Sequence, residues 1–283
     1  MSVLNERAVL VALKCTHWSG RKLDKRATAR FNSEHKADAD AGRYNKLLLA
    51  KEALSKITKV SGSGRTLHYY LTLPWGDNGQ RLLPTQVYWE YVNDMQGLEE
   101  EFYRQVDEFV KAYPSLVAET KARLGDLYNP DDYPDPEVIR EKFSFSITIN
   151  PVPDAGDFRV DIENDAMEEI KADLKARLST TQQEAMRDLW ERLRKSVAEV
   201  SKKFADTDKK VIFRDTLIGN IRDLVDLIPK MNIDGDPELD RMAAEIKREM
   251  ADFDPQDLRD FPIERVKAKA KADALVAKMG AFM

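Results

Sequence analysis

Apolar residues follow two kinds of pattern along the chain, and the change falls near residue 164. Before that point, short apolar runs and alternating segments stand between stretches with helical spacing, and residues 143–149 alternate strictly. After that point, apolar residues recur only at helical spacing. The pattern predicts a mixed α/β region over residues 1–164 and an all-helical region over residues 165–283.

The extended segments predict a small sheet within a helix-dominated protein. Strands are expected over residues 8–18, 66–73, 143–149 and 158–162, with a short returning strand near 81–83. Residues 21–41 read as a short helix plus loop, residues 42–60 as a helix, and Ser61–Gly64 (SGSG) as a flexible connector. The expected fold class is α+β, with a mostly antiparallel sheet and long antiparallel, coiled-coil-like helices.

A long helix is predicted over residues 85–113, and Pro114 should end it or kink it. Its apolar residues recur at steps of three and four, which makes one near-continuous stripe. Such a stripe can pack against another chain or form the core of a single chain. The stripe begins with the residues that we take as the candidate self-association surface: Tyr88, Tyr91, Met95, Leu98 and Phe102.

Charge is unevenly distributed along the chain. The net charge is −5, yet residues 1–65 hold 14 Lys/Arg against 6 Asp/Glu. A basic region of this kind can meet nucleic acid, an acidic partner, or the acidic remainder of its own fold. Residues 17–36 interleave cations with aromatic rings, as surfaces that follow a phosphate backbone do. The candidate residues for binding nucleic acid or an acidic partner are Trp18, Arg21, Lys22, Lys25, Arg26 and Arg30.

Motifs for catalysis are missing from the sequence. The three histidines stand at no metal-ligand spacing, the single cysteine Cys15 lies in an apolar strand, and the SGSGR segment lacks the phosphate-loop pattern. We therefore expect no catalytic residues, no metal and no cofactor. An enzyme with a carboxylate metal site, for which Asp131, Asp132 and Asp135 are the nearest candidates, is the weakest interpretation.

The expected cellular compartment follows from two segments that the sequence lacks. The sequence shows neither a signal peptide nor an apolar run of about 20 residues, so we expect a cytoplasmic protein without a membrane partner.

The segment VLVALKCTHWSGRKLDK (residues 9–25) resembles an uncharacterised family found mainly in tailed phages and prophages. The likeness extends through the following helix, the strand before Pro74 and Trp75, and the hairpin near residues 143–160. Proteins of this family are often encoded near MoxR-type AAA+ ATPases and von Willebrand factor A proteins. The resemblance implies a phage protein in the infected host cell, with an AAA+ ATPase as one candidate partner, and implies no activity.

These observations favour a non-enzymatic interaction or assembly protein, either self-associating into a homo-oligomer or acting as an adaptor. Opposite charges at the two ends of a chain favour head-to-tail association. The alternative is a nucleic-acid-binding protein that uses the basic N-terminal patch, whose binding would weaken steeply with salt.

Overall fold

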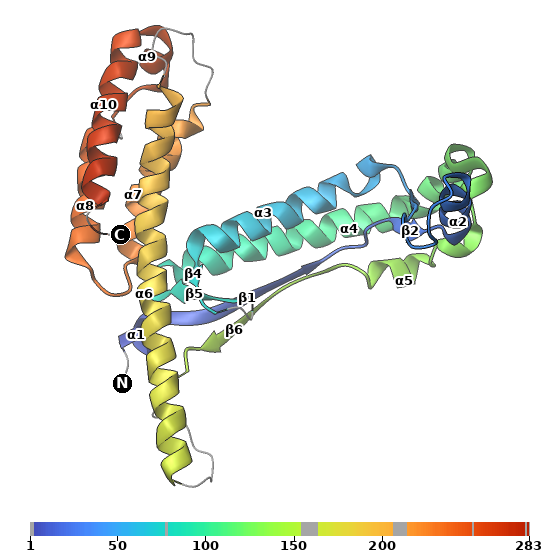
Figure 1. Cartoon of the computed structure of the whole chain (residues 1–283), viewed down its shortest axis with the longest axis horizontal. Coiled ribbons are helices and arrows are strands. Elements are labelled where there is room, and N and C mark those ends of the chain that lie inside the picture. The colour runs from blue at the N-terminus through green and yellow to red at the C-terminus, as the bar shows by residue number, and fades with distance from the viewer. Residues whose placement is uncertain are drawn as a thin grey trace. The chain divides into compact units, whose positions relative to one another are not determined.

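A computed structural model describes residues 3–76, 79–153, 164–205, 214–250, 252–280 and 282. Within them the chain is a helix-dominated α+β protein with a small antiparallel sheet, which confirms the expected fold class (Figure 1). The boundary at residue 164 between a mixed and an all-helical region stays a prediction, because residues 154–163 lie outside the described part. The expected strand over 158–162 lies outside it as well.

The described strands lie in the first 151 residues, where they are interspersed with helices, and the described residues after 163 form helices and the connections between them. The strands are β1 (Ala8–Thr16), β2 (Arg21–Leu23), β3 (Asn45–Leu47), β4 (Leu73–Pro74), β5 (Gln80–Pro84) and β6 (Ser144–Pro151). The α-helices are α1 (Val3–Arg7), α2 (Lys25–Glu34), α3 (Ser55–Leu71), α4 (Tyr88–Leu124), α5 (Pro136–Arg140), α6 (Asn164–Lys203), α7 (Thr216–Met231), α8 (Pro237–Met250), α9 (Pro255–Asp260) and α10 (Pro262–Met279). Short 3₁₀ turns are η1 (Lys51–Leu54), η2 (Thr85–Val87), η3 (Gly125–Leu127) and η4 (Pro130–Asp132).

The main sheet has the strand order β4-β5-β1-β6. Strand β5 pairs antiparallel with β1, where Leu10 faces Leu82, and with β4. A separate two-stranded ladder joins β2 to β3, with Arg21 opposite Leu47. Residues 8–18 were expected as a strand and mostly form one, since β-branched and apolar side chains suit a half-buried pleat.

The chain divides into two compact units, each discontinuous in sequence. The first holds residues 1–12, 71–90 and 149–283, and the second holds residues 13–70 and 91–148. In the second unit α3 and α4 lie antiparallel, since His68 meets Tyr91 and Lys56 meets Glu108 (Figure 1).

The stripe of α4 forms part of the core of this second unit. The ring of Phe102 lies 5.5 Å from that of Phe145, and the ring of Phe109 lies 5.6 Å from that of Phe143. Both partners belong to or adjoin β6. The helix continues through Pro114 as far as Leu124, so proline does not end it.

Two sequence predictions in the second unit are wrong. Residues 61–71 continue helix α3 instead of forming a connector and the start of a strand. Residues 45–54, expected as helix, form β3 and η1. In both places distant contacts override local preference: Ser61 Oγ lies 3.0 Å from Cys15 Sγ, and β3 finds its ladder partner about twenty residues earlier in β2.

The first unit contains helices α6, α7, α8 and α10, which pack together through apolar faces. Residues 179–181, where a new helix was one alternative, lie inside the single helix α6. Arg192 on α6 is paired with Asp188 and donates to the backbone oxygen of Thr72 at 2.6 Å, which ties α6 to the segment before β4. None of the described helices combines the length and apolar content that crossing a bilayer requires.

Candidate binding surface around helix α2

Helix α2 is closed at both ends by local hydrogen bonds. At its start the Asp24 carboxylate accepts from the backbone N–H of Ala27 at 2.9 Å. At its end Lys36 N–H donates to Ser33 O at 3.1 Å and Ala37 N–H to Asn32 O at 2.9 Å. This pair of bonds is a Schellman motif, with Lys36 at the left-handed position that glycine usually fills.

The backbone of Lys36 is accordingly unusual. Its φ is 52°, and it is the only non-glycine residue with positive φ in the described part of the chain. Left-handed backbone costs a side-chain-bearing residue about 1 kcal/mol relative to glycine. A lysine at position 36 therefore makes the fold less stable than a glycine would.

The loop after α2 is held by the buried side chain of Asn32, which is 3% exposed. Its amide donates to Ala39 O at 3.0 Å and to Gly42 O at 3.3 Å. A Cβ at Gly42 would lie 3.0 Å from Asn32 Oδ1, so the loop passes too close for a larger residue to fit easily. These bonds fix the loop against one face of α2.

A hollow of about 780 Å³ lies between this loop and α2, and we call it the α2 hollow. Lys25, Lys36 and Arg43 line it, together with a single carboxylate, Asp40. None of these three cations forms an ion pair with another described residue. Leu23 adds an apolar wall. The hollow therefore combines net positive charge with apolar surface in a preformed shape.

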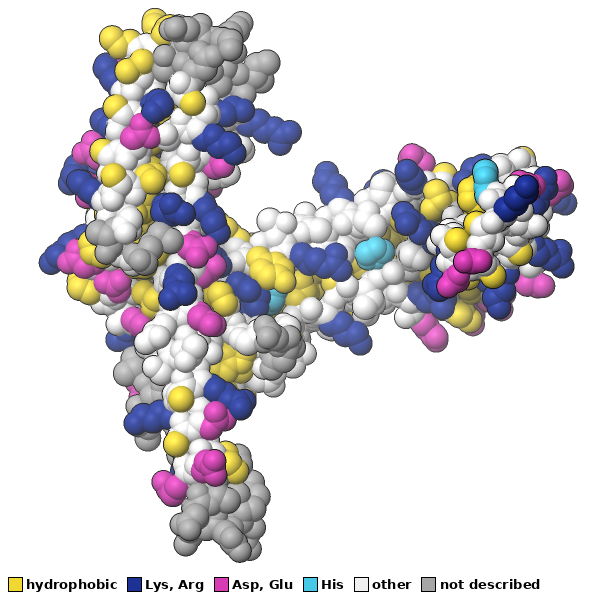
Figure 2. All heavy atoms as spheres, in the orientation of Figure 1, with side chains coloured by type: hydrophobic (Ala, Val, Ile, Leu, Met, Phe, Trp, Pro, Cys, Tyr) yellow, Lys and Arg dark blue, Asp and Glu magenta, His cyan; other side chains and the backbone are white. Residues whose placement is uncertain are grey.

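Two aromatic rings lie exposed near the hollow. Phe31 is 56% exposed and its ring centroid lies 4.5 Å from that of His35; Tyr44 is 43% exposed. Lys and Arg side chains, interleaved with apolar and some acidic ones, gather over the end of the unit that carries α2 (Figure 2).

A buried charge cluster anchors this segment to the rest of the unit. The ammonium of Lys46 lies 2.6 Å from Asp132 Oδ2 and 3.2 Å from Asp24 Oδ2, and it donates to Leu127 O at 2.7 Å. Lys22 lies 2.8 Å from the other Asp132 oxygen. Strands β2 and β3 and the start of α2 are thereby fixed to the acidic segment at η4.

Hydrogen bonds outweigh burial in setting the pKa values of Lys46, Asp132 and Asp24. Burial lowers the pKa of Lys46, but hydrogen bonds to Asp132 and Asp24 leave it raised overall. Burial raises the pKa of Asp132, yet hydrogen bonds from Lys22 and Lys46 leave it lowered. The backbone N–H of Ala27 is the largest cause that lowers the pKa of Asp24. Lys46, Asp132 and Asp24 are thus stabilised in their charged forms.

The residues of the predicted basic patch separate into different roles. Trp18 packs on Phe109 and Tyr113, with ring centroids 6.4 and 6.0 Å away. Lys22 is committed to Asp132, and Arg30 to Glu34 at 2.7 Å.

Lys25 and Arg26 stay exposed in the first turn of α2, and Arg21 lies on β2 beside a different hollow. The structure adds Lys36 and Arg43 to Lys25. Lys36 ends the segment 17–36 but was not among the candidate residues, and Arg43 lies outside that segment. Arg43 follows a glycine in a charged loop, and only the fold shows that this loop returns to α2.

Part of the N-terminal positive charge is balanced inside the same unit. Residues 13–70 hold 13 Lys/Arg and 5 Asp/Glu, whereas residues 91–148 hold 6 Lys/Arg and 13 Asp/Glu. The ion pairs of Lys22 with Asp132 and of Lys56 with Glu108 connect the two segments. One of the alternatives, pairing with the protein's own acidic residues, thus applies to some of the cations. Those of the α2 hollow have no ion-pair partner among the residues that the structure describes.

The predicted self-association residues are mostly interior. Tyr91, Met95 and Phe102 are at most 1% exposed, and Tyr88 is half-buried. Tyr91 Oη lies 2.8 Å from His68 Nδ1 on α3, and burial raises the pKa of this tyrosine.

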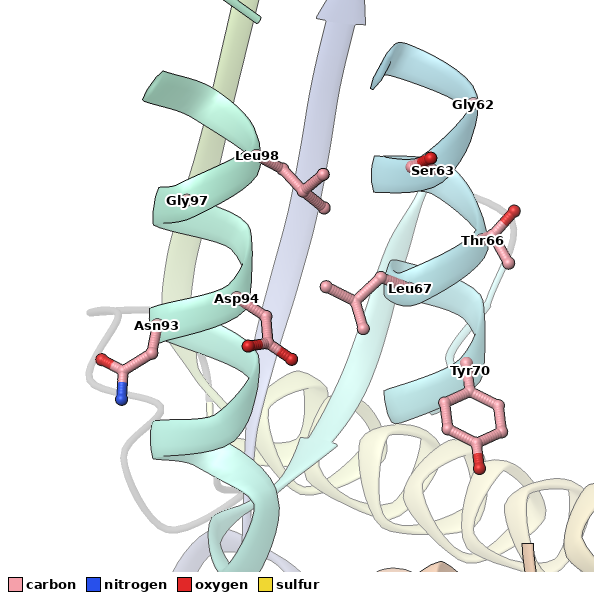
Figure 3. Close-up of a pocket in the computed structure, with 9 residues that line it drawn as sticks. All are labelled: Gly62, Ser63, Thr66, Leu67, Tyr70, Asn93, Asp94, Gly97 and Leu98. Atoms are coloured by element: carbon pink, nitrogen blue, oxygen red, sulfur yellow. The ribbon is translucent and has the colours of Figure 1, made fainter. Parts of the chain in front are cut away.

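Leu98 is half-buried and lines a groove between α3 and α4, and Leu67 points into the groove from α3 (Figure 3). The groove is open because Gly62 and Gly97 carry no side chains. The stripe therefore serves mainly as core within one unit.

Comparison of the chain with models of protein families, with curated proteins and with solved structures gives no match.

Proposed function

We propose that the chain is a non-enzymatic interaction protein, an adaptor that binds an acidic segment of a protein partner in the α2 hollow. The observation that carries the proposal is a group of three cations, Lys25, Lys36 and Arg43, that form no ion pair with a described residue and surround a partly apolar hollow. Cations without ion-pair partners attract carboxylates. When the hollow that holds them is already shaped, less free energy is spent on ordering its side chains and loop during binding.

The geometry of Lys36 supports the same reading. Its backbone would be more stable as glycine, yet its charged side chain lines the hollow. Strained residues held firmly by their surroundings are frequent at binding sites. The charge cluster of Lys46 holds the segment in place, as a binding surface requires.

Self-association and the phage context remain parts of this proposal. Because Tyr91, Met95 and Phe102 are buried within one unit, a homo-oligomer would have to use another surface. Light scattering during size-exclusion chromatography distinguishes a 32.4 kDa monomer from an oligomer. A role in the infected host cell, with an AAA+ ATPase as partner, rests on the sequence resemblance and is tested by co-elution with a co-expressed MoxR-type ATPase.

Binding of a fluorescent Glu/Asp-rich peptide, followed by anisotropy at fixed ionic strength, tests the proposal. The triple variant Lys25→Glu, Lys36→Glu, Arg43→Glu reverses the charge of the hollow. The matched control reverses three exposed lysines of the same unit outside it: Lys59→Glu, Lys111→Glu, Lys121→Glu. We expect the first triple to abolish binding and the second to weaken it only slightly. Equal losses would show a general charge effect and would remove the α2 hollow as the site.

Nucleic-acid binding is the second candidate, and the exposed rings of Phe31 and Tyr44 favour it. Bases can stack on such rings while the neighbouring cations follow the phosphates. In that case a single-stranded oligonucleotide would bind more tightly than the acidic peptide. Phe31→Ala with Tyr44→Ala would then weaken binding, by about 1–3 kcal/mol for each stacked base. Unchanged affinity in that variant would exclude stacking.

A further inference from the structure

A second and smaller hollow lies between the loop 17–21 and the segment 47–58, with a volume of about 330 Å³. Its polar lining consists of His17, Ser19, Arg21, Lys51 and Thr58. The remaining lining is mostly apolar and comes from the loop and from the chain around β3 and η1: Trp18, Gly20, Leu47, Leu49, Ala50 and Leu54. This hollow shares no lining residue with the α2 hollow.

The walls of this hollow are fixed by backbone geometry. Gly20 has φ of 62°, and its carbonyl accepts from Leu48 N–H at 2.7 Å. A Cβ at Gly20 would lie 3.3 Å from the Leu54 side chain, so both the turn and the close approach favour glycine. The backbone N–H of Arg21 donates to Ser19 Oγ at 3.4 Å, and Arg21 itself is held in the ladder with Leu47.

The charge inside the hollow is positive and unbalanced. Arg21 and Lys51 form no ion pair with a described residue, and no carboxylate lines the hollow. Nδ1 of His17 is buried and has no hydrogen-bond partner among the described residues. Buried polar atoms nearly always have a hydrogen-bond partner. The imidazole nitrogen of His17 is therefore a polar atom that a bound molecule could still pair with.

We propose that this hollow binds a small organic phosphate. The guanidinium of Arg21 offers the planar pair of donors that fits phosphate oxygens, and Lys51 adds a compact second charge. The hydroxyl group of Ser19 can donate to a third oxygen. The volume exceeds what a phosphate group alone fills and lies at the lower end of ligand pockets, so the apolar wall takes the organic part.

Calorimetric titration of the full chain with phenyl phosphate, inorganic phosphate and phenol tests this proposal at constant ionic strength. We expect saturable binding of phenyl phosphate, weaker binding of inorganic phosphate and none of phenol. Arg21→Gln and Lys51→Gln should each weaken phenyl phosphate binding about tenfold, since each removes a charge-assisted hydrogen bond. Both side chains are exposed, and circular dichroism verifies that the variants fold.

The control variant is Lys25→Gln with Lys36→Gln, which changes the α2 hollow alone. Its affinity for phenyl phosphate should equal that of the parent chain. No saturable binding by the folded parent chain, or an equal loss in the control variant, overturns the proposal. Because the acidic-peptide assay reads the other hollow, failure of either proposal is visible independently of the other.

Discussion

The ammonium of Lys46 lies 2.6 Å from Asp132 Oδ2, and both side chains are only 6% exposed. These residues are far apart in sequence, and the pair fixes β3 to η4. Lys46 also contacts Asp24, while Lys22 takes the second oxygen of Asp132. The charge of Lys46 is thus balanced by two carboxylates and a backbone oxygen, and each carboxylate has at least one ammonium partner.

Removing Lys46 should destabilise the chain much more than removing an exposed lysine. Lys46→Met leaves Asp24 without its ammonium partner and Asp132 with Lys22 alone, so we expect a loss of about 3 kcal/mol in the free energy of unfolding. The control Lys56→Met breaks a pair whose side chains are 73% and 47% exposed, and should cost less than about 1 kcal/mol. Urea denaturation measures both. Similar small losses would show that the cluster contributes little.

The contribution of this cluster to stability should depend on pH in both directions. The pKa values of Asp24 and Asp132 are lowered in the folded chain, so their stabilisation is present above the ordinary value of 3.8 and is lost as pH falls through the folded values. The pKa of Lys46 is raised, so its stabilisation is present below 10.5 and is lost as pH rises through the folded value.

The difference in unfolding free energy between the parent chain and Lys46→Met should therefore be constant around neutral pH and shrink at both extremes. Denaturation curves recorded at several pH values give this difference directly. A difference that stays constant into strong acid would contradict the pairing of Lys46 with the two carboxylates.

The sequence was sufficient for the elements whose pattern is long or strictly alternating. The strand at residues 143–149, the stripe of α4 and the helical character of the described residues after 164 all follow from periodicity. A stripe alone, however, does not show which surface covers it. In α4 that surface is supplied by α3 and β6, through contacts such as Tyr91 with His68 and Phe102 with Phe145.

The candidate site was less predictable than the fold. The cations and aromatic rings of residues 17–36 were expected to form one surface patch, yet Lys22 pairs with Asp132 and Trp18 packs in the core. Lys36 and Arg43 join Lys25 only because Asn32 returns the loop to α2. Spacing in sequence carries no information about such a return.

Replacing Lys36 by glycine should stabilise the fold. The left-handed backbone at φ 52° costs glycine nothing, so Lys36→Gly should raise the unfolding free energy by about 1 kcal/mol. Lys36→Ala keeps the Cβ and therefore the strain, so it should have little effect on stability. If the α2 hollow is the binding site, both variants weaken acidic-peptide binding because both remove the ammonium group. Only Lys36→Gly also gains stability. A destabilised Lys36→Gly would show that the lysine side chain supports the fold.

Two glycines of α3, two residues apart, should respond to alanine in opposite ways. A Cβ at Gly64 would lie 2.7 Å from Cε2 of Phe145, whose side chain is 1% exposed and packs against Phe102. Because the ring is buried against its neighbours, the overlap forces side chains or backbone to shift, and Gly64→Ala should cost about 1–3 kcal/mol. A Cβ at Gly62 meets no atom within 4 Å, and Gly62→Ala should gain about 0.5–1 kcal/mol from helix propensity.

The clash itself can be tested by shortening its partner. Phe145→Leu alone should destabilise the core, but combined with Gly64→Ala it should cost less than the two separate losses added together. This coupling arises because the smaller side chain leaves room for the new methyl group. Additive losses would mean that Gly64 is needed for its backbone and not for the space beside Phe145. The cycle thus decides why a Ser-Gly-Ser-Gly sequence, which looks like a connector, stands in the middle of a helix.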